Sequence, residues 1–294
     1  MQNLADLPTI SVVIPSFNQG YFIEETIVSV LGQQYPKLEV IIIDGGSTDH
    51  TIDIVQSYAS QLTYWHSRPD NGQGDAINQG MRLSSGDILC WLNSDDLLLP
   101  GTLLYVGRTL SKHLDQPKLI YGHALLIEHQ GEGQCAGAQD AIPFDAKRLT
   151  YSDYMVQPAS FWTRALWEVT GELDPTLWYT LDWEWYIRAS QYCHFTFQPR
   201  YFAIYRIHPQ QKTSTGFSRR REEIVGVVQR YATLYWAKLF EIVLSLYPEI
   251  RLTLDWLLRM RVPKPTAFLL LRFPQLVPKL KHPQDVHTVL HMLG

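Results

Sequence analysis

Short apolar runs alternate with segments of helical periodicity through the first third of the chain. The runs lie at Ile10–Ile14, Val40–Ile43, Leu62–Trp65 and Ile88–Leu92. The first two runs are rich in Val and Ile, and turn residues follow them, which is typical of buried strands. Between them, apolar residues recur every three or four positions in segments 23–31, 52–59 and 75–83, which predicts helices. This alternation predicts an α/β fold with three layers around a mostly parallel sheet.

The pattern changes after about residue 117. Strands are predicted at Leu119–Ile127, Ser160–Trp162 and Tyr201–Ile207, and a helix at Asp182–Ser190. Beyond about Gly216 the pattern is helical to the end, although prolines interrupt it. We therefore expect a main domain over 1–216, with halves of about 9–116 and 117–216. A helical C-terminal region over 217–294 would follow.

Polar residues follow three of the predicted strands. Ser16 and Asn18 come after the first, Asp44 after the second, and Asp95 and Asp96 after the fourth. The carboxyl ends of parallel strands meet at one edge of a sheet, where ligands of such folds bind. The sequence therefore predicts a binding site at this edge.

Asp95 and Asp96 are candidate metal ligands. Carboxylates suit Mg²⁺ or Mn²⁺, whose remaining positions are commonly filled by phosphates and water. The alternative is that one of the two caps the helix predicted after Pro100. Both interpretations stay open on the sequence.

Asp44 precedes two glycines in the segment Asp44–Asp49 (DGGSTD). Its carboxylate could accept hydrogen bonds from a base or a ribose, and Gly45 would let a ligand approach the backbone closely. The alternative is an Asp that binds the backbone N–H groups of its own turn.

Two pairs in the second half could carry chemistry. Either Asp182 or Glu184 could be a general base, because residues two apart on a helix do not share a face. The alternative is a helix cap at Asp182 and a surface Glu184. Arg206 and His208 share a face if they lie in a strand, and could hold a diphosphate or complete a metal site. The alternative is a surface pair.

Eight segments stand in a characteristic order along roughly residues 10 to 215. They are Ser11–Asn18, Ile42–Asp49, Asp70–Gly80, Gly86–Ile88, Leu92–Asp96, Gln157–Trp162, Asp182–Trp185 and Arg206–His208. In this order they resemble the family 2 glycosyltransferases, which are nucleotide-diphospho-sugar transferases of the GT-A fold.

The resemblance implies a role for each matching position. The nucleotide sugar would be bound by Pro15, Ser16, Asn18, Asp44, Gly45, Asp75, Asn93, Asp95 and Arg206. The metal would be bound by Asp95, Asp96 and His208. The family's Asp-x-Asp motif reads Asn93–Asp95 here, so Asp95 and Asp96 supply its charge. Asp182 matches the general base of inverting members, with Glu184 as the other candidate.

The implied function is the transfer of a sugar from a UDP-, GDP- or dTDP-sugar, with Mn²⁺ or Mg²⁺, to a sugar or lipid-linked sugar. Such a role suits the synthesis of a cell-envelope polysaccharide or glycolipid. The alternative is a non-catalytic protein that binds sugar nucleotides or carbohydrates. A nucleotidyltransferase is disfavoured because the loop Pro15–Gly20 lacks Lys and Arg, and a dehydrogenase because no GxGxxG occurs.

Composition narrows the partners and the location. The 294 residues carry a net charge of −4, without the basic excess of nucleic-acid-binding proteins, so no nucleic acid is expected. Three widely spaced cysteines argue against a disulfide framework or a zinc site and fit a reducing cytoplasm. Neither a signal peptide nor a transmembrane run is predicted.

The segment from Arg259 to Lys281 contains six Lys and Arg residues and no acid, interleaved with Leu269–Leu271 and Phe273. Basic and apolar residues together predict a peripheral contact with the cytoplasmic face of a membrane. The alternative is a helical cap with a solvated basic face.

Overall fold

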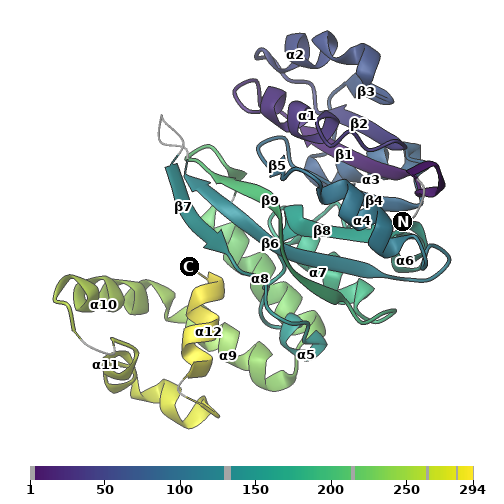
Figure 1. The fold of residues 1–294 in the computed structure, drawn as a ribbon. Helices are drawn as coiled ribbons and strands as arrows, with labels where there is room; N and C mark the ends of the chain where they lie inside the picture. The colour runs from purple at the N-terminus through teal and green to yellow at the C-terminus, as the bar shows by residue number, and fades with distance from the viewer. Residues whose placement is uncertain (1–3, 129–133, 213–215, 263–264, 283, 294) are drawn as a thin grey trace. The chain divides into compact units, whose positions relative to one another are not determined.

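The computed structural model describes residues 4–293 except 129–133, 213–215, 263–264 and 283 (Figure 1). The chain divides into two compact units. The first unit comprises Met1–Ala146 and Tyr154–Thr215, and the second comprises Lys147–Asp153 and Gly216–Gly294.

The first unit is built on a sheet whose N-terminal half is parallel. Strands β1 (Ile10–Ser16), β2 (Leu38–Asp44), β3 (Tyr64–Ser67) and β4 (Ile88–Trp91) lie in the order β3-β2-β1-β4 (Figure 1). Every residue of β1 is buried, as expected for a parallel strand covered on both faces. The strand ends are in register: Ser16 pairs with Asp44, and Asp44 pairs with Ser67.

The other strands extend this sheet in a mixed arrangement. They are β5 (Leu97–Leu98), β6 (Leu119–Glu128), β7 (Gln134–Gln139), β8 (Ser160–Thr163) and β9 (Thr196–Ile207). The order continues β4-β8-β6-β9-β5, with β7 on the side of β6. β8 is antiparallel to β4 and β6, whereas β6 and β9 are parallel. β9 begins five residues before the predicted strand. The prediction missed these first residues because they are largely exposed and carry no apolar pattern.

Helices flank the sheet and join its strands. They are α1 (Ile23–Leu31), α2 (Thr51–Ser57), α3 (Gln73–Leu83), α4 (Thr102–Leu110), α6 (Arg164–Thr170) and α7 (Leu181–Ala189). Short 3₁₀ turns lie at Leu4–Asp6, Ala59–Gln61 and Gln157–Ala159, and the four-residue α5 at Ala146–Leu149. Gly80 lets α3 pack closely on β1, since a Cβ there would lie 2.3 Å from Cγ1 of Val13. The predicted α/β class is confirmed.

A tryptophan cluster attaches α7 to the sheet. The rings of Trp91 at the end of β4, Trp162 in β8 and Trp185 in α7 lie 4.9–6.5 Å apart between centroids. All three side chains are fully buried. Tilted and edge-to-face rings of this size contribute strongly to a core. Helix α7 is therefore held against the strand that leads into Asp95 and Asp96.

The second unit is helical, as predicted for the C-terminal region. It contains α8 (Phe217–Tyr231), α9 (Leu234–Ser245), α10 (Tyr247–Arg259), α11 (Pro265–Arg272), a 3₁₀ helix (Pro274–Lys279) and α12 (Gln284–Leu293). The ring of Tyr151 stacks on Trp236 at 3.9 Å, which joins the 147–153 segment to this unit. Within the described residues, no helix combines the length and apolarity needed to cross a membrane.

Candidate functional site

The loops after β1 and β2 are joined by hydrogen bonds. The backbone N–H of Asn18 donates to Ser47 Oγ (2.7 Å), and that of Thr48 donates to Asn18 Oδ1 (2.9 Å). Asn18 has φ 51°, a left-handed conformation that Asn tolerates well. The structure thus brings together two of the segments that the sequence predicts at one edge of the sheet.

Asp44 is fully buried and occupied by its own loop. Its Oδ2 accepts from the backbone N–H groups of Gly46 (3.0 Å) and Ser47 (2.8 Å) and from Ser67 Oγ (2.7 Å). Its Oδ1 accepts from Ser47 Oγ. The turn interpretation therefore describes Asp44. The predicted nucleotide contact does not fit, because the carboxylate is enclosed and saturated.

The absence of a side chain at Gly45 leaves room for the carboxylate of Asp70. A Cβ on Gly45 would lie 3.1 Å from the Asp70 carboxylate oxygens, so Asp70 occupies the space that was predicted for a ligand. Burial raises the pKa of Asp70, although the backbone N–H of Gly72 donates to its Oδ1 at 2.7 Å. Sequence reasoning assigned Asp70 no role beyond its place in a motif.

Ser16 ends β1 next to Pro15, and both residues are buried. Ser16 Oγ has no hydrogen-bond partner among the described residues. Buried hydroxyls are normally paired, so an unpaired one at a binding edge is a group that a ligand could satisfy.

Asp96 faces the interior and is 1% exposed. Its Oδ1 accepts from the backbone N–H of Arg206 (3.2 Å), and its Oδ2 accepts from Asn93 Nδ2 (3.3 Å). Burial, and then the neighbouring charge of Asp95, raise the pKa of Asp96 well above its usual value. The capping alternative fails for both aspartates, since α4 has Gly101 as its N-cap and no side-chain cap.

Asp95 instead faces His208. Asp95 Oδ2 lies 3.1 Å from His208 Nε2, and the histidine ring packs on Phe22 at 4.3 Å between centroids. The Asp95 side chain is 20% exposed, so this carboxylate can be reached from outside. Arg206 and His208 are 2% and 3% exposed, which excludes the surface-pair alternative.

The predicted three-residue metal set is not found. The described residues contain no group of three or more His, Cys, Asp or Glu side chains that could hold a metal. Asp96 is excluded from the set because its oxygens are taken up in the interior. Asp95 and His208 offer one carboxylate and one imidazole, a pair that suits Mn²⁺ or Mg²⁺ if a diphosphate and water complete the coordination.

Arg206 is a buried connection between three segments. Its guanidinium donates to the Asp95 carbonyl, to the Glu25 carboxylate, and to Phe22 O and Thr26 Oγ1 (both 3.1 Å). All three guanidinium nitrogens therefore already bind oxygens of the protein. The predicted contact with a diphosphate does not fit this placement. Arg206 instead fixes the position of the Asp95 backbone against α1.

We expect Arg206→Gln to lower the free energy of unfolding by about 2 kcal/mol, because buried acceptors lose charge-assisted hydrogen bonds. Urea unfolding followed by circular dichroism measures this change. Arg82→Gln is the matched control, since Arg82 forms a comparable ion pair with Glu172 but is 54% exposed. The control should lose about 0.5 kcal/mol. Equal losses in the two variants would contradict the structural role.

A chain of amide side chains borders the Asp95 loop. Gln73 Nε2 donates to Asn93 Oδ1 (2.7 Å), and Asn93 Nδ2 donates to Gln157 Oε1 (3.2 Å). Lys212 Nζ donates to Gln73 Oε1 (2.7 Å) and lies 4.5 Å from the centre of the Trp178 ring. Asn93 was predicted to bind the nucleotide sugar, and the structure places it within this network.

Four residues of this network received no role from the sequence. They are Gln73, Gln157, Trp178 and Lys212. Gln73 and Gln157 lie within the motif segments, which could have drawn attention to them. Trp178 packs so closely on Gly72 that a Cβ there would lie 2.7 Å from its ring, and Gly72 has φ 103°. No local sequence pattern predicts the contact between Trp178 and Gly72 or the position of Lys212.

Asp75 lies in the first turn of α3 and is half-buried. Its Oδ2 accepts from both the backbone N–H and Nδ2 of Asn71 (3.1 Å each). Burial works to raise its pKa, but these bonds and one from Gln79 bring it below the usual value. The bonds to Asn71 secure the turn that precedes α3.

The two candidate bases have different surroundings. Helix α7 begins after Thr180, so Asp182 lies inside the first turn and is half-buried, with Oδ1 accepting from Trp183 N (2.8 Å). Glu184 is 2% exposed, and both its oxygens accept from Arg188 Nε (3.0 Å). Neither the helix-cap nor the surface alternative holds. An enclosed, ion-paired Glu184 does not fit a base that must reach an acceptor.

Comparison with solved structures assigns the fold of the chain. The chain superimposes on mannosyltransferase PcManGT from Pyrobaculum calidifontis, solved with GDP-Man and Mn²⁺, with a TM-score of 0.61 and 16% identity. This match covers 100% of the chain and 87% of PcManGT. S. aureus TarS 1–349 with UDP-GlcNAc gives a TM-score of 0.56 and 17% identity, over 80% and 70% of the two chains. The chain spans 39% of the longer TarS chain. The fold is therefore of the GT-A type.

Sequence comparison gives the family. Residues 11–118 match the profile "Glycosyl transferase family 2". A PGL/p-HBAD biosynthesis glycosyltransferase of Mycobacterium tuberculosis is 30% identical over 186 residues, which are 62% of this chain and 70% of that protein. The chain belongs to glycosyltransferase family 2. The predicted resemblance and the GT-A fold are both confirmed.

Proposed function

We propose that the chain is an inverting, metal-dependent glycosyltransferase that uses a nucleoside diphosphate sugar. Family membership supports sugar transfer in general. The observation that carries the finer proposal is the Asp95–His208 pair at the strand ends, where a carboxylate and an imidazole lie 3.1 Å apart.

The donor is proposed to bind at the edge formed by the loops after β1, β2 and β4. Ser16, with its unpaired hydroxyl, and Pro15 would contact the nucleotide, while Asn18, Asp44 and Gly45 would shape the loops around it. The related structures contain UDP-GlcNAc and GDP-Man, and a UDP-, GDP- or dTDP-sugar is proposed here. Residues 1–216 would form the catalytic domain and 217–294 an extension.

Mn²⁺ or Mg²⁺ would be held by Asp95 and His208. Such an ion would supply positive charge to the leaving diphosphate. Arg206 would keep the Asp95 backbone in place, and Asn93 would keep the loop in register through Gln73 and Gln157. These residues preorganise the edge at which the diphosphate would lie.

Asp182 is proposed as the general base. Its carboxylate would take the proton of an acceptor hydroxyl as that oxygen bonds to the anomeric carbon. The bond from the anomeric carbon to the diphosphate oxygen breaks in the same displacement, so the configuration inverts and the nucleoside diphosphate leaves. Because Glu184 is enclosed by its pair with Arg188, the proposal assigns the base to Asp182 alone.

The acceptor is proposed to be a sugar or a lipid-linked sugar of the cell envelope. Support comes from the mycobacterial relative, which is named for PGL/p-HBAD biosynthesis. A contact between the C-terminal helices and the cytoplasmic face of a membrane is part of this proposal.

A thermal-shift screen of nucleoside diphosphates and their sugars tests the donor site. A ligand that binds only the native state raises the free energy of unfolding, by about 2.7 kcal/mol when its concentration is a hundred times Kd. Tm rises as a result. We expect one nucleotide family to raise Tm, and only with Mn²⁺ or Mg²⁺ present. A flat response to every compound would refute the donor site. Donor hydrolysis by the same samples separates an enzyme from a non-catalytic binder.

A further inference from the structure

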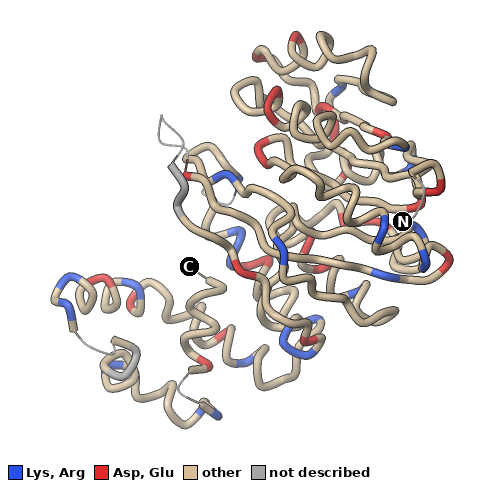
Figure 2. The backbone as a smooth tube through the Cα atoms, in the orientation of Figure 1, with Lys and Arg blue, Asp and Glu red and all other residues tan. Residues whose placement is uncertain are grey.

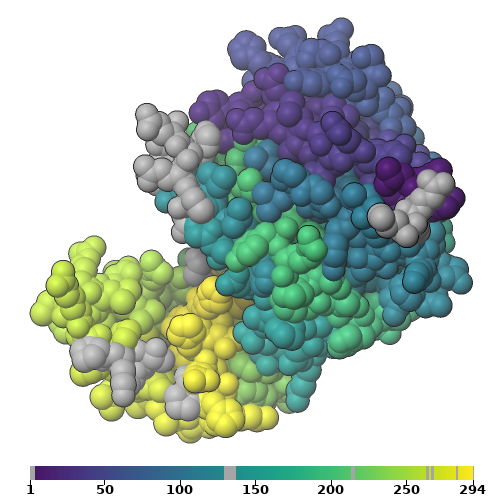
Figure 3. All heavy atoms as spheres, viewed as in Figure 1, coloured from purple at the N-terminus to yellow at the C-terminus, as the bar shows by residue number. Residues whose placement is uncertain are grey.

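Helices α10 and α11 of the second unit carry large apolar side chains on their surface. Leu252 is 72% exposed, Trp256 59% and Leu271 77%, with Phe268 at 48%. Figure 3 shows this yellow-green part of the chain at the surface. Exposed apolar clusters of this kind mark interaction sites more often than single exposed residues do.

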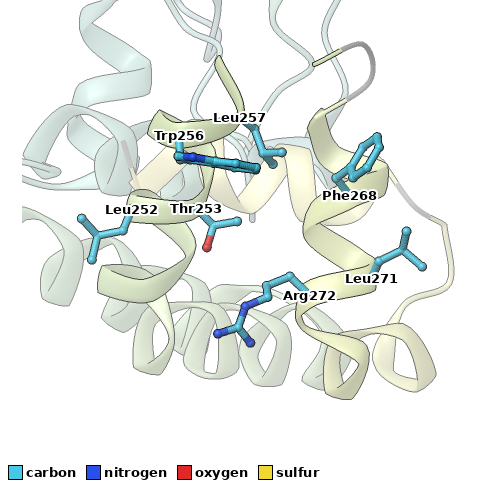
Figure 4. Close-up of a pocket in the computed structure, with 7 residues that line it drawn as sticks. All are labelled: Leu252, Thr253, Trp256, Leu257, Phe268, Leu271 and Arg272. Atoms are coloured by element: carbon cyan, nitrogen blue, oxygen red, sulfur yellow. The ribbon is translucent and has the colours of Figure 1, made fainter. Parts of the chain in front are cut away.

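These side chains form the walls of a cavity of about 550 Å³ between the two helices. Figure 4 shows Leu252 and Trp256 extending from α10, and Phe268 and Leu271 from α11. Leu252 and Trp256 are four residues apart, as are Phe268 and Arg272, so each helix presents one face to the cavity. We call the surface formed by Leu252, Trp256, Phe268, Leu271 and Arg272 the apolar patch.

Basic residues accompany the apolar patch. Arg259 lies on the same face of α10 as Leu252, seven residues further on. Arg259, Arg261, Arg272, Lys279 and Lys281 are all exposed. The segment Arg259–Lys281 contains no acid, although the whole chain carries a net charge of −4. Figure 2 shows blue segments at the C-terminal end of α10 and red ones along the same helix, where Asp255 pairs with Arg251 at 3.2 Å.

We propose that the apolar patch docks on an anionic lipid bilayer. The inference rests on the membrane contact included in the proposed function. It specifies the apolar patch as the protein surface involved and anionic lipid as its partner. Trp256, Leu252 and Leu271 enter the boundary between headgroups and acyl chains, where a helix lying in the interface buries its apolar face. Arg259 and Arg272 lay their aliphatic stems along that surface and place their guanidinium groups among lipid phosphates.

Charge distinguishes this occupant from a second copy of the chain. Two copies paired through the same patch would bring their arginines and lysines together, which costs free energy. An anionic bilayer complements the basic residues and covers the apolar ones at the same time. The solvated-cap alternative leaves Leu252, Trp256 and Leu271 in water without explanation.

Flotation of the full chain with vesicles tests the proposal. We expect binding to phosphatidylcholine vesicles that contain phosphatidylglycerol, weaker binding to phosphatidylcholine alone, and a loss of binding as salt rises. Each Lys or Arg near an anionic surface contributes about fivefold. Arg259→Gln combined with Arg272→Gln should therefore weaken binding to the anionic vesicles by about 25-fold. Trp256→Ser combined with Leu271→Ser should weaken binding to both kinds of vesicle at least about tenfold.

Matched controls lie in the first unit. Val169→Ser removes an apolar side chain that is 45% exposed, and Arg108→Gln with Lys112→Gln removes two exposed charges. Both controls should float like the wild type. Trp256→Phe keeps an aromatic ring and should float like the wild type. A circular dichroism spectrum and a Tm of the serine variant that match those of the wild type separate a loss of binding from a folding defect.

Three outcomes overturn the inference. These are no flotation with any vesicle, equal losses in the patch and control variants, and a wild-type dimer that the serine variant converts to a monomer without any change in flotation. Donor hydrolysis in vesicle-free solution is measured in parallel. If the chain floats but does not hydrolyse a donor, membrane docking is supported and the proposed glycosyltransferase function is contradicted. If the chain hydrolyses a donor but never floats, the proposed function is supported and membrane docking is contradicted.

Discussion

Asp182→Asn is expected to lower kcat about 10²–10⁴-fold, because the amide cannot take the proton of the acceptor hydroxyl. The Kd of the donor should change little, since the amide keeps the size of the carboxylate and its oxygen can still accept from Trp183 N. Transfer kinetics with saturating donor, together with calorimetric titration of the nucleoside diphosphate, measure the two quantities separately.

Glu168→Gln is a suitable control for this variant. Glu168 is an exposed carboxylate in α6, a helix that packs against α7, and its replacement should leave kcat unchanged. A pH profile adds a second criterion, since the acidic limb of kcat should disappear in Asp182→Asn if this group is the base. Donor binding lost in parallel with kcat would place Asp182 in the donor site instead.

Asp95→Ala is expected to weaken metal-dependent donor binding by roughly 100-fold. Residues that merely support metal ligands already contribute about 10–100-fold, and Asp95 is proposed as a ligand itself. Titration of the nucleoside diphosphate at fixed Mn²⁺ measures the effect. The variant should also abolish the Mn²⁺-dependent rise in Tm.

Asp96→Asn is the matched control, one residue along the chain. Asp96 is enclosed, and its raised pKa means that its environment favours the uncharged acid, which Asn resembles. The variant should retain the Mn²⁺ response of the wild type. If Asp96→Asn and Asp95→Ala lose that response equally, the assignment of the metal to Asp95 and His208 is wrong.

The sheet, and the edge at which the candidate site is proposed, could be predicted from local patterns. The predicted strands at Val40–Ile43 and Ile88–Leu92 are continuous apolar runs, and the one at Ile10–Ile14 is interrupted only by Ser11. Runs of this kind are typical of strands buried on both faces of a parallel sheet. Because β1, β2 and β4 are adjacent and parallel, the polar residues at their ends reach one edge. That step follows from topology alone and needs no knowledge of side-chain contacts.

The direction of each side chain could not be predicted in the same way. Asp95 and Asp96 are neighbours in sequence, yet one faces His208 and the other the interior, since the turn from Asn93 to Asp96 rotates the chain between them. Arg206 was expected to contact the diphosphate because a positive charge at that position could bind phosphate oxygens. Its actual partners lie about 110 and 180 positions away, a separation at which no sequence pattern operates.

The connections made by Arg206 also bear on the order in which the site can form during synthesis. Residues 11–118 match the family profile, and they leave the ribosome well before β9 does. Yet the backbone at Asp95 and the carboxylate of Asp96 are both held by Arg206, which lies in that late strand. A nascent chain that ends before β9 therefore contains the half proposed to bind the nucleotide, but it lacks the residue that fixes the loop proposed to bind the metal. If the proposed donor site is right, we expect donor binding only after nearly the whole first unit has been made.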